Sequence, residues 1–399
     1  MSEWKTIKAE DFCYSVTDGT HDSPKGKENG HYLITSKHLA PYAIDFSSAK
    51  RISEEDYKKV IKRSPVEQWD ILFSMIGTIG ITYLEKNSDI DYACKNMGIF
   101  KFNGDKEKAY WLYYFLQTPQ AKEYILGHLR GTTQQYLPLG SLRDFPIQVA
   151  PTETRERITA ILRDIDDKIE LNISINENLE QQAQAIFKAW FVDFEPFGGV
   201  MPDDWSETTL GKIASISTKS INPLKQPELY LEHYSIPAYD EKHYPVFEYA
   251  SEIKSNKYVL TNNSIMISKL NPETKRIWRP LCLSSNPVCS TEFIVYESFN
   301  PEHKDYIYSL IDSKAFLDYL CAHTTGSTNS RQRATPKTTL DFSCVLPTND
   351  VINCFCGTVT PMYNQIATNL IENQHLAALR DTLLPKLMSG EIDVSKVKI

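Results

Sequence analysis

The sequence predicts an α+β fold in which two similar α+β domains are separated by two long helices that form an antiparallel coiled coil. Three observations predict it: the chain repeats itself, each copy mixes strand-like and helical patterns, and a long amphipathic segment follows each copy. We expect the domains at residues 1–151 and 201–347, and the helical segments at 152–200 and 348–399. The duplication predicts a pseudo-twofold relation between the halves.

The first copy alternates short apolar runs with turn residues. HYLITS, DILFSMI and MGIFKF are bounded by glycine and asparagine, which is typical of strands. WLYYFL has apolar residues three and four apart and predicts one helix in this copy. The copy is therefore expected to be an α+β unit of roughly 150 residues.

The first helical segment has an apolar seam that recurs at alternating steps of three and four residues. The seam predicts a continuous helix from Arg155 to Phe191, about 55 Å long at about 1.5 Å per residue. The sequence EPFGG after Phe194 predicts a firm end.

The second copy repeats the first in the same order, at an offset of about 195 to 201 residues. Trp205 matches Trp4, and Cys289 matches Cys94. SIMISKL and EFIVYE predict strands, and DYIYSLI predicts the single helix of this copy. Because the order and the spacing are both kept, chance similarity is the less favoured explanation.

The second helical segment aligns with the first at an offset of 197 residues. We expect its helix only after Pro361, because proline interrupts a helix interior. Two asparagines on each helix lie on or near the seam, where burial would select one register, or on exposed flanks. These residues are Asn172, Asn176, Asn369 and Asn373.

Composition describes a globular chain of 399 residues with 41% hydrophobic and 24% charged residues. No apolar run approaches the roughly 18 residues of a membrane span, and the N-terminus lacks a signal-peptide pattern, so a cytoplasmic location is expected. The eight cysteines are scattered and are expected to be free thiols. Cys354 and Cys356 lack a second ligand pair, so no metal site is expected.

Charge is unevenly distributed around a net value of −8. Residues 25–63 hold nine basic and five acidic side chains, and residues 253–340 hold eleven and seven. These two stretches could face phosphates, although ordinary surface charge explains them equally well. The sequence has no nucleotide-binding loop, no methyltransferase motif and no coupled nuclease set, so the chain is expected not to be an enzyme.

Several segments resemble the specificity subunits of Type I restriction-modification enzymes over essentially the whole chain. They are TDGTHDSP, HYLITSKHL, DILFSMIGTIG, GTTQQYLPLGSLRDFPI, QQAQAIFKAWFVDFEPF and LRDTLLPKLMSGEIDV. The resemblance implies that each domain recognises one half of a bipartite asymmetric site in double-stranded DNA, and that the helices set the spacing. Two departures are KLNPETKRIW in place of GTIG, and the join APTETRERI, which lacks the Glu-Gln pair common in relatives.

The resemblance also implies the partners. Two methyltransferase subunits would dock on the helices, and restriction subunits would complete the complex. This chain would hold no cofactor and no catalytic residue; S-adenosylmethionine would belong to the methyltransferase, and ATP with Mg²⁺ to the restriction subunit. The alternative from another class is an adaptor that spaces two protein-binding modules and does not bind DNA.

Candidate DNA contacts are basic, hydroxyl and amide side chains in loops that could reach a groove. In the first copy they are Thr20, His21, Ser36, Lys37, His38, Thr132, Thr133, Gln134 and Gln135. In the second copy they are Ser268, Lys269, Lys275, Arg276, Arg279, Ser327, Asn329, Arg331, Gln332 and Arg333. The alternative is that these loop residues only form turns.

Candidate partner contacts are large apolar residues near the helix ends, more than a two-helix seam can bury. They are Trp190, Phe191, Leu384, Leu387 and Met388. Packing against the adjacent recognition domain is an equally good explanation.

Overall fold

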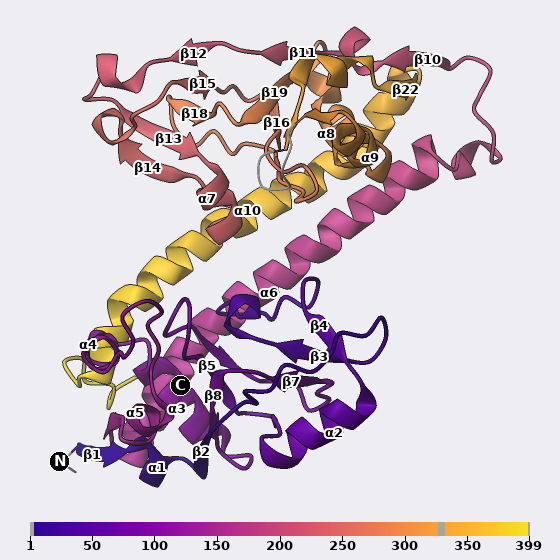
Figure 1. Ribbon diagram of the computed structural model, residues 1–399. Helices are drawn as coiled ribbons and strands as arrows, with labels where there is room; N and C mark the ends of the chain where they lie inside the picture. Colours follow the sequence, from indigo (N-terminus) through magenta and orange to yellow (C-terminus); the bar gives the residue numbers. More distant parts are fainter. Residues whose placement is uncertain (1–3, 326–331, 398–399) are drawn as a thin grey trace. The chain divides into compact units, whose positions relative to one another are not determined.

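The computed structural model describes residues 4–325 and 332–397, which form two compact units. Unit 1 consists of Met1–Glu170 with Gln374–Ile399, and unit 2 consists of Leu171–Asn373. Each long helix therefore contributes residues to both units (Figure 1). None of the helices in the described part of the chain is both long and apolar enough to span a membrane.

Unit 1 contains a four-stranded antiparallel sheet in the order β2-β8-β5-β6 and a three-stranded sheet in the order β4-β3-β7, in which β3 and β7 are parallel. A further pair, β1 with β9, joins the two ends of the domain. The strands are β1 (Lys5–Lys8), β2 (Ser15–Asp18), β3 (His31–Ile34), β4 (Lys50–Ile52), β5 (Ile71–Ser74), β6 (Thr82–Leu84), β7 (Tyr92–Cys94), β8 (Met97–Lys101) and β9 (Pro146–Val149).

The helices of unit 1 are α1 (Ala9–Phe12), α2 (Glu54–Arg63), α3 (Lys106–Phe115), α4 (Pro119–Gly127) and α5 (Leu139–Arg143). The expectation of a single helix in this copy is wrong, because the structure has α3 followed by α4. Thr118 caps α4 by accepting a 3.2 Å hydrogen bond from the Ala121 amide, and Pro119 occupies its first turn. The sequence pattern did not indicate α2, whose amphipathic turns begin at the cap Ser53.

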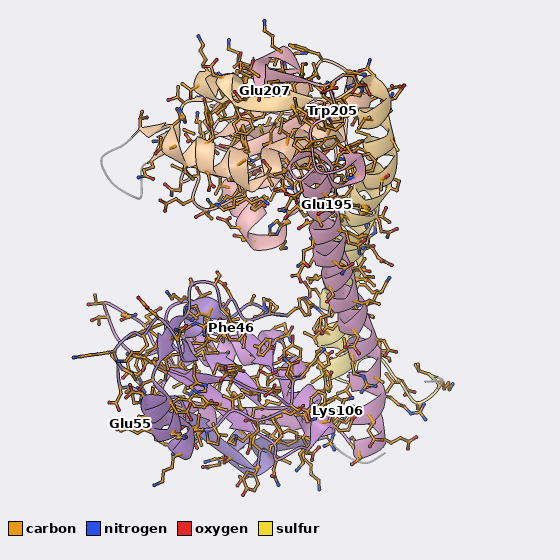
Figure 2. All side chains as sticks on the ribbon, turned by 90° about the vertical axis from the view of Figure 1, so that its right-hand side faces the viewer. Phe46, Glu55, Lys106, Glu195, Trp205 and Glu207 are labelled. Carbon is orange, nitrogen blue, oxygen red and sulfur yellow. The ribbon has the colours of Figure 1, made fainter. Side chains whose placement is uncertain are left out.

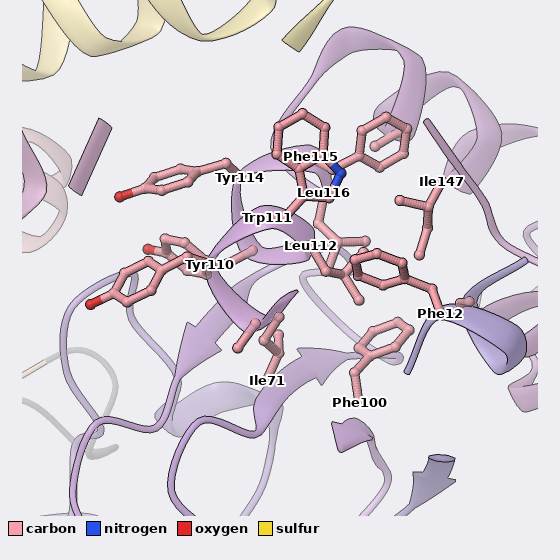
Figure 3. Packing of buried hydrophobic residues seen from close by; sticks show 14 of the residues in the cluster. Phe12, Ile71, Phe100, Tyr110, Trp111, Leu112, Tyr114, Phe115, Leu116 and Ile147 are labelled. Carbon is pink, nitrogen blue, oxygen red and sulfur yellow. The ribbon is translucent and has the colours of Figure 1, made fainter. Parts of the chain in front are cut away.

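The core of unit 1 forms where α3 packs over the four-stranded sheet (Figure 3). Trp111 is fully buried and its indole N–H donates to the Gln148 carbonyl at 2.9 Å. Ile71 and Phe100 on the sheet belong to the same cluster, and so do Leu384 and Met388 of the second long helix. The helical segment of unit 1 is thus part of the domain core.

Unit 2 repeats this plan with a four-stranded antiparallel sheet, β11-β19-β16-β17, and a larger sheet, β12-β15-β18-β13-β14. The strands are β10 (Ser206–Thr209), β11 (Ala214–Ser217), β12 (Ser220–Ile221), β13 (Tyr230–Tyr234), β14 (Val246–Tyr249), β15 (Lys257–Val259), β16 (Ser264–Ser268), β17 (Ile277–Trp278), β18 (Pro287–Ser290), β19 (Phe293–Ser298), β20 (Thr324–Thr325), β21 (Arg333–Ala334) and β22 (Ser343–Leu346). Its short helices are α7 (Ile236–Lys242), α8 (Lys304–Asp312) and α9 (Lys314–Ala322), so the single helix expected for this copy is also wrong.

The predicted internal repeat is confirmed by equivalent contacts in the two units. Cys94 and Cys289 are buried on β7 and β18, each in parallel pairing with a matching strand. Tyr124 meets Phe145 with ring centroids 4.6 Å apart, and Tyr319 meets Phe342 at 5.2 Å. Because the same pairs recur in matched elements, the copies share one framework.

The long helices are α6 (Thr152–Phe191) and α10 (Asn349–Met388). The expectation that Pro361 precedes the second helix is wrong, because α10 runs through it without interruption. Proline in a helix interior costs about 3 kcal/mol. Burial of Val359 and Tyr363, two residues before and after it, offsets that cost, while Pro361 itself lies on the exposed side.

Within unit 2, α6 and α10 pack antiparallel, and the seam asparagines pair across them. Asn172 donates to the Asn373 side-chain oxygen at 2.8 Å, and Asn369 donates to Asn176 at 2.8 Å. Asn172, Asn176 and Asn369 are buried, so the exposed-flank interpretation fails for these three. Since unpaired amides are costly inside a helix interface, the two pairs favour a single register.

Candidate nucleic-acid interface

In unit 1 the structure brings together two loops that lie far apart in the sequence. The turn after β5 contains the GTIG glycines, and Ile76 in this turn forms a bridge with Tyr136. Arg130 and Tyr136 exchange two backbone hydrogen bonds of 2.9 Å, which close the loop 130–136. The predicted residues Thr132, Thr133, Gln134 and Gln135 form its exposed tip.

Gly131 explains why this loop begins with glycine. Its φ of +89° is a left-handed conformation, and a Cβ there would lie 2.3 Å from the Gln134 carbonyl oxygen. The tight turn therefore requires glycine, while the four exposed residues after it are free of that constraint. The backbone therefore constrains the residue type at the base of the loop and leaves the tip free to carry other side chains.

Unit 2 contains the same pair of loops. The turn after β16 lies beside the hairpin β20–β21, through a bridge between Leu270 and Arg333 and a 3.0 Å bond from the Asn271 amide to the Gln332 carbonyl. The predicted Ser327, Asn329 and Arg331 lie outside the described residues. Gln332 is half-buried and Arg333 is exposed.

Most of the predicted cations of unit 2 pair with carboxylates of the same unit. Arg276 binds Asp240 through two bonds of 2.6 and 2.9 Å, and Arg279 binds Asp305 through bonds of 2.7 and 3.2 Å. Arg333 lies 3.0 Å from Glu292. The remaining pair joins Lys275 to Asp312, and burial raises the pKa of this aspartate. These bidentate and buried pairs fix side-chain positions and neutralise the local charge.

Three other predicted residues are buried and serve their own loops. The Thr20 amide donates to the Cys94 carbonyl at 2.9 Å, while His38 accepts from the Thr35 amide at 2.8 Å. Burial lowers the pKa of His38, so its imidazole is neutral at pH 7. The Ser268 hydroxyl donates to the Leu270 carbonyl at 2.9 Å.

The neighbours of these residues are more accessible. Lys37 is exposed, Ser36 and Lys269 are half-buried, and exposed His21 contacts both Asp18 and Asn96 at 2.9 Å. DNA contact by any of the predicted residues stays a prediction, and the exposed ones are the best placed for it.

The predicted partner residues lie largely inside the two cores. Phe191 packs against Tyr306 and Phe355 with ring centroids 5.0 Å away in each case, and Trp190 is half-buried beside it. Leu384, Leu387 and Met388 are buried in the core of unit 1. Packing against the adjacent domain, the alternative interpretation, accounts for them, while partner contact at these positions stays a prediction.

Sequence reasoning missed one group of residues in unit 1. Lys27, Tyr32, Phe46, Lys50 and Arg51 line an open depression of about 480 Å³ beside β3 and β4. The only sequence signal for this group was the net positive charge of residues 25–63. Individual residues could not be chosen because their proximity depends on strand register.

In the described part of the chain, no group of three or more histidine, cysteine or acidic side chains is arranged to hold a metal ion. All eight cysteines are free thiols. Burial raises the pKa of Cys356 to about 11, which disfavours a thiolate.

Comparison with known proteins agrees with this arrangement. Residues 1–181 match the family described as Type I restriction modification DNA specificity domain. The chain is 27% identical to the specificity subunit of the Type I restriction enzyme MjaIX of Methanocaldococcus jannaschii, over 99% of this chain and 95% of the relative. It is 24% identical to the specificity subunit of the Haemophilus influenzae enzyme HindI, over 84% and 88%.

One solved structure supports the fold. The crystal structure of the Type I restriction-modification system S subunit from M. genitalium matches with a TM-score of 0.55 at 16% identity, covering 96% of each chain. At that identity the likeness concerns the fold alone.

Proposed function

We propose that this chain is a Type I restriction-modification specificity subunit and acts as the DNA-recognition subunit of such a complex. In that role the chain would be non-catalytic. One observation carries the proposal. In both units, two loops distant in sequence lie side by side at the end of matching sheet strands, β5 and β16, and the loops differ in sequence between the copies. Each unit would recognise its own half-site.

The paired helices would set the spacing between the two half-sites. Support comes from α6 and α10, which both continue without a break from one unit into the other. The buried asparagine pairs favour one register, and a fixed register is what a fixed spacing requires.

Two methyltransferase subunits would dock on the helical segments, at near-equivalent places because the chain is duplicated. They would hold S-adenosylmethionine, and restriction subunits would hold ATP and Mg²⁺. Trp190 is the most accessible of the predicted docking residues, and Val192 beside it is 53% exposed. Both lie at the C-terminal end of α6 or just beyond it.

Selection from random duplex DNA tests the DNA-recognition proposal. The chain would be co-expressed with its methyltransferase partner and the complex incubated with the pool at several salt concentrations. We expect recovery of a bipartite motif and an affinity that falls linearly with salt on logarithmic axes. Binding without sequence selection, or no binding at all, would support the adaptor alternative.

A double substitution tests the assignment of half-sites. Arg331→Ala with Arg333→Ala should weaken binding to one half of the motif only, since both residues belong to the second copy. Lys314→Ala on α9 is a matched control, because its partner Asp318 lies on the same helix. Equal losses on duplexes mutated in either half would refute the assignment.

A further inference from the structure

The depression in unit 1 is built by strand register. In the β3–β4 ladder, Tyr32 lies opposite Arg51, and Arg51 in turn lies opposite Lys27 through an isolated bridge. Directly opposed residues on neighbouring strands project to the same face of a sheet. Lys27, Arg51 and Tyr32 therefore form one cross-strand row.

Aromatic rings form the base of this depression. Phe46 lies 4.9 Å from Tyr32 and 5.7 Å from Tyr92, between ring centroids, and is labelled in Figure 2. The Arg51 guanidinium sits 4.1 Å above the Tyr32 ring. Stacking on a ring fixes the plane of the guanidinium and leaves part of its edge available for two oxygens of an oxyanion.

Among the described residues, no carboxylate forms an ion pair with Lys27, Lys50 or Arg51. Arg51 donates to the Gly30 carbonyl at 2.9 Å and to the Tyr32 hydroxyl, and Lys50 donates to the Pro24 carbonyl. Glu28 is the one acidic side chain among the lining residues. Arg276, Arg279 and Arg333 of unit 2 differ, because each pairs with an aspartate or a glutamate.

We propose that this depression binds the phosphodiester backbone of DNA at the half-site recognised by the first copy. Lys27 and Lys50 neutralise phosphates, and Arg51, positioned by Tyr32, binds one phosphate with two parallel N–H groups. The inference rests on the proposed function and adds to it a phosphate-binding site outside the paired loops. We call this site, formed by Lys27, Lys50 and Arg51, the clamp. An open, shallow shape with three cations suits a linear polyanion that passes across the surface.

Salt dependence of binding tests the clamp. Lys27→Ala, Lys50→Ala, Arg51→Gln and the triple variant would be compared with wild type as complexes with the methyltransferase partner. Each lost phosphate contact should reduce the slope of log affinity against log salt by about 0.9. The loss should be alike for different base sequences, because backbone contacts carry no sequence information.

Two variants serve as controls. Arg51→Lys keeps the positive charge and removes the planar guanidinium with its two parallel N–H groups. The slope of log affinity against log salt should therefore stay near wild type, while the affinity for DNA falls less than in Arg51→Gln. Lys122→Ala removes an exposed positive charge on α4 and should leave both slope and affinity near wild type. Unfolding curves of every variant would establish that the domain is intact.

The outcomes separate the clamp from the proposed function. If wild type selects a bipartite motif and the triple variant keeps the wild-type slope, the clamp is wrong and DNA recognition stands. If the triple variant instead loses its methyltransferase partner in size-exclusion chromatography, the surface is a protein interface and the clamp is overturned. If wild type does not bind DNA, both proposals fail.

Discussion

The edge strands β4 and β14 occupy the same place in the two units and present opposite chemistry. Matching Cys94 with Cys289 places Tyr32 and Arg51 of unit 1 where unit 2 has Glu232 and Phe247. On β4 itself, Lys50 is exposed and Arg51 is half-buried. In unit 2, β14 exposes Val246 and Tyr249, and its neighbour β13 exposes Tyr230.

The comparison indicates that the two copies keep equivalent buried contacts and differ in the side chains on their surfaces. Tyr124 and Tyr319 donate to the equivalent carbonyls of Ser141 and Thr338, at 3.1 and 2.9 Å. Such bonds position elements in a shared core. An edge strand has no such constraint, so each copy can present its own surface to a ligand.

The largest expected effect is the loss of an equivalent core ring. Phe145→Ala in unit 1 and Phe342→Ala in unit 2 should each lower the free energy of unfolding by about 3–5 kcal/mol, because each opens a cavity beside the matching tyrosine. Urea unfolding followed by circular dichroism measures this loss. A change below about 1 kcal/mol in either variant would show that the two cores are not equivalent.

A smaller loss is expected from the asparagine seam. Asn369→Ala leaves the buried Asn176 oxygen without its 2.8 Å donor, which should cost about 1–3 kcal/mol of unfolding free energy. His375→Ala, an exposed position on the same helix, is the control and should change stability little. Equal effects of the two substitutions would mean that the amide pair does not stabilise the helix interface.

The pH dependence of the unfolding free energy should differ between the two units because of one histidine. Glu54 and Asp91 raise the pKa of His31 on β3, and its ring stacks on Tyr57 with centroids 3.8 Å apart; unit 2 has buried Leu231 at the matching position. Because the pKa is raised on folding, this stabilisation is present below pH 6.5 and is lost as the pH rises through the raised value.

The His31→Gln substitution removes the titrating group. It should therefore destabilise the protein more at about pH 6 than at about pH 8.5. Urea unfolding at both pH values measures the difference. The same loss at both would contradict a titrating role for His31.

The smallest effect is expected at the aromatic edge. Tyr249 is 55% exposed, so Tyr249→Ala should change the unfolding free energy by no more than about 0.5 kcal/mol. Since no charge is removed, the salt slope of DNA binding should match wild type. A slope reduced by as much as in Arg51→Gln would mean that the two edges do not differ as their charges indicate.

The repeat, the central strands and the long first helix could be predicted from the sequence because local periodicity encodes them. The errors lie where tertiary contacts override local preference. Pro361 ends an isolated helix but is accommodated in α10 by the buried residues around it. The apolar WLYYFL run gave no sign that Thr118 would begin a second helix.

At the candidate nucleic-acid interface, too, the sequence could not show which distant residues contact one another. Sequence reasoning selected the exposed TTQQ tip but could not show that Ile76 pairs with Tyr136 and brings two loops together. It selected Arg276 and Arg279 as charged residues, whereas the fold pairs both with aspartates. The sequence gives the sign of each side-chain charge. Whether that charge is paired with an opposite one depends on which residues the fold brings into contact.

By itself, the sequence determined that this protein is a duplicated α+β chain with two amphipathic helices, because residue order carries both the repeat and the hydrophobic period. Only the tertiary structure decided which cations remain uncompensated, which loops adjoin and which helix residues are hidden in the cores. Those properties arise from strand register and packing between residues far apart in the chain, and no local pattern specifies them.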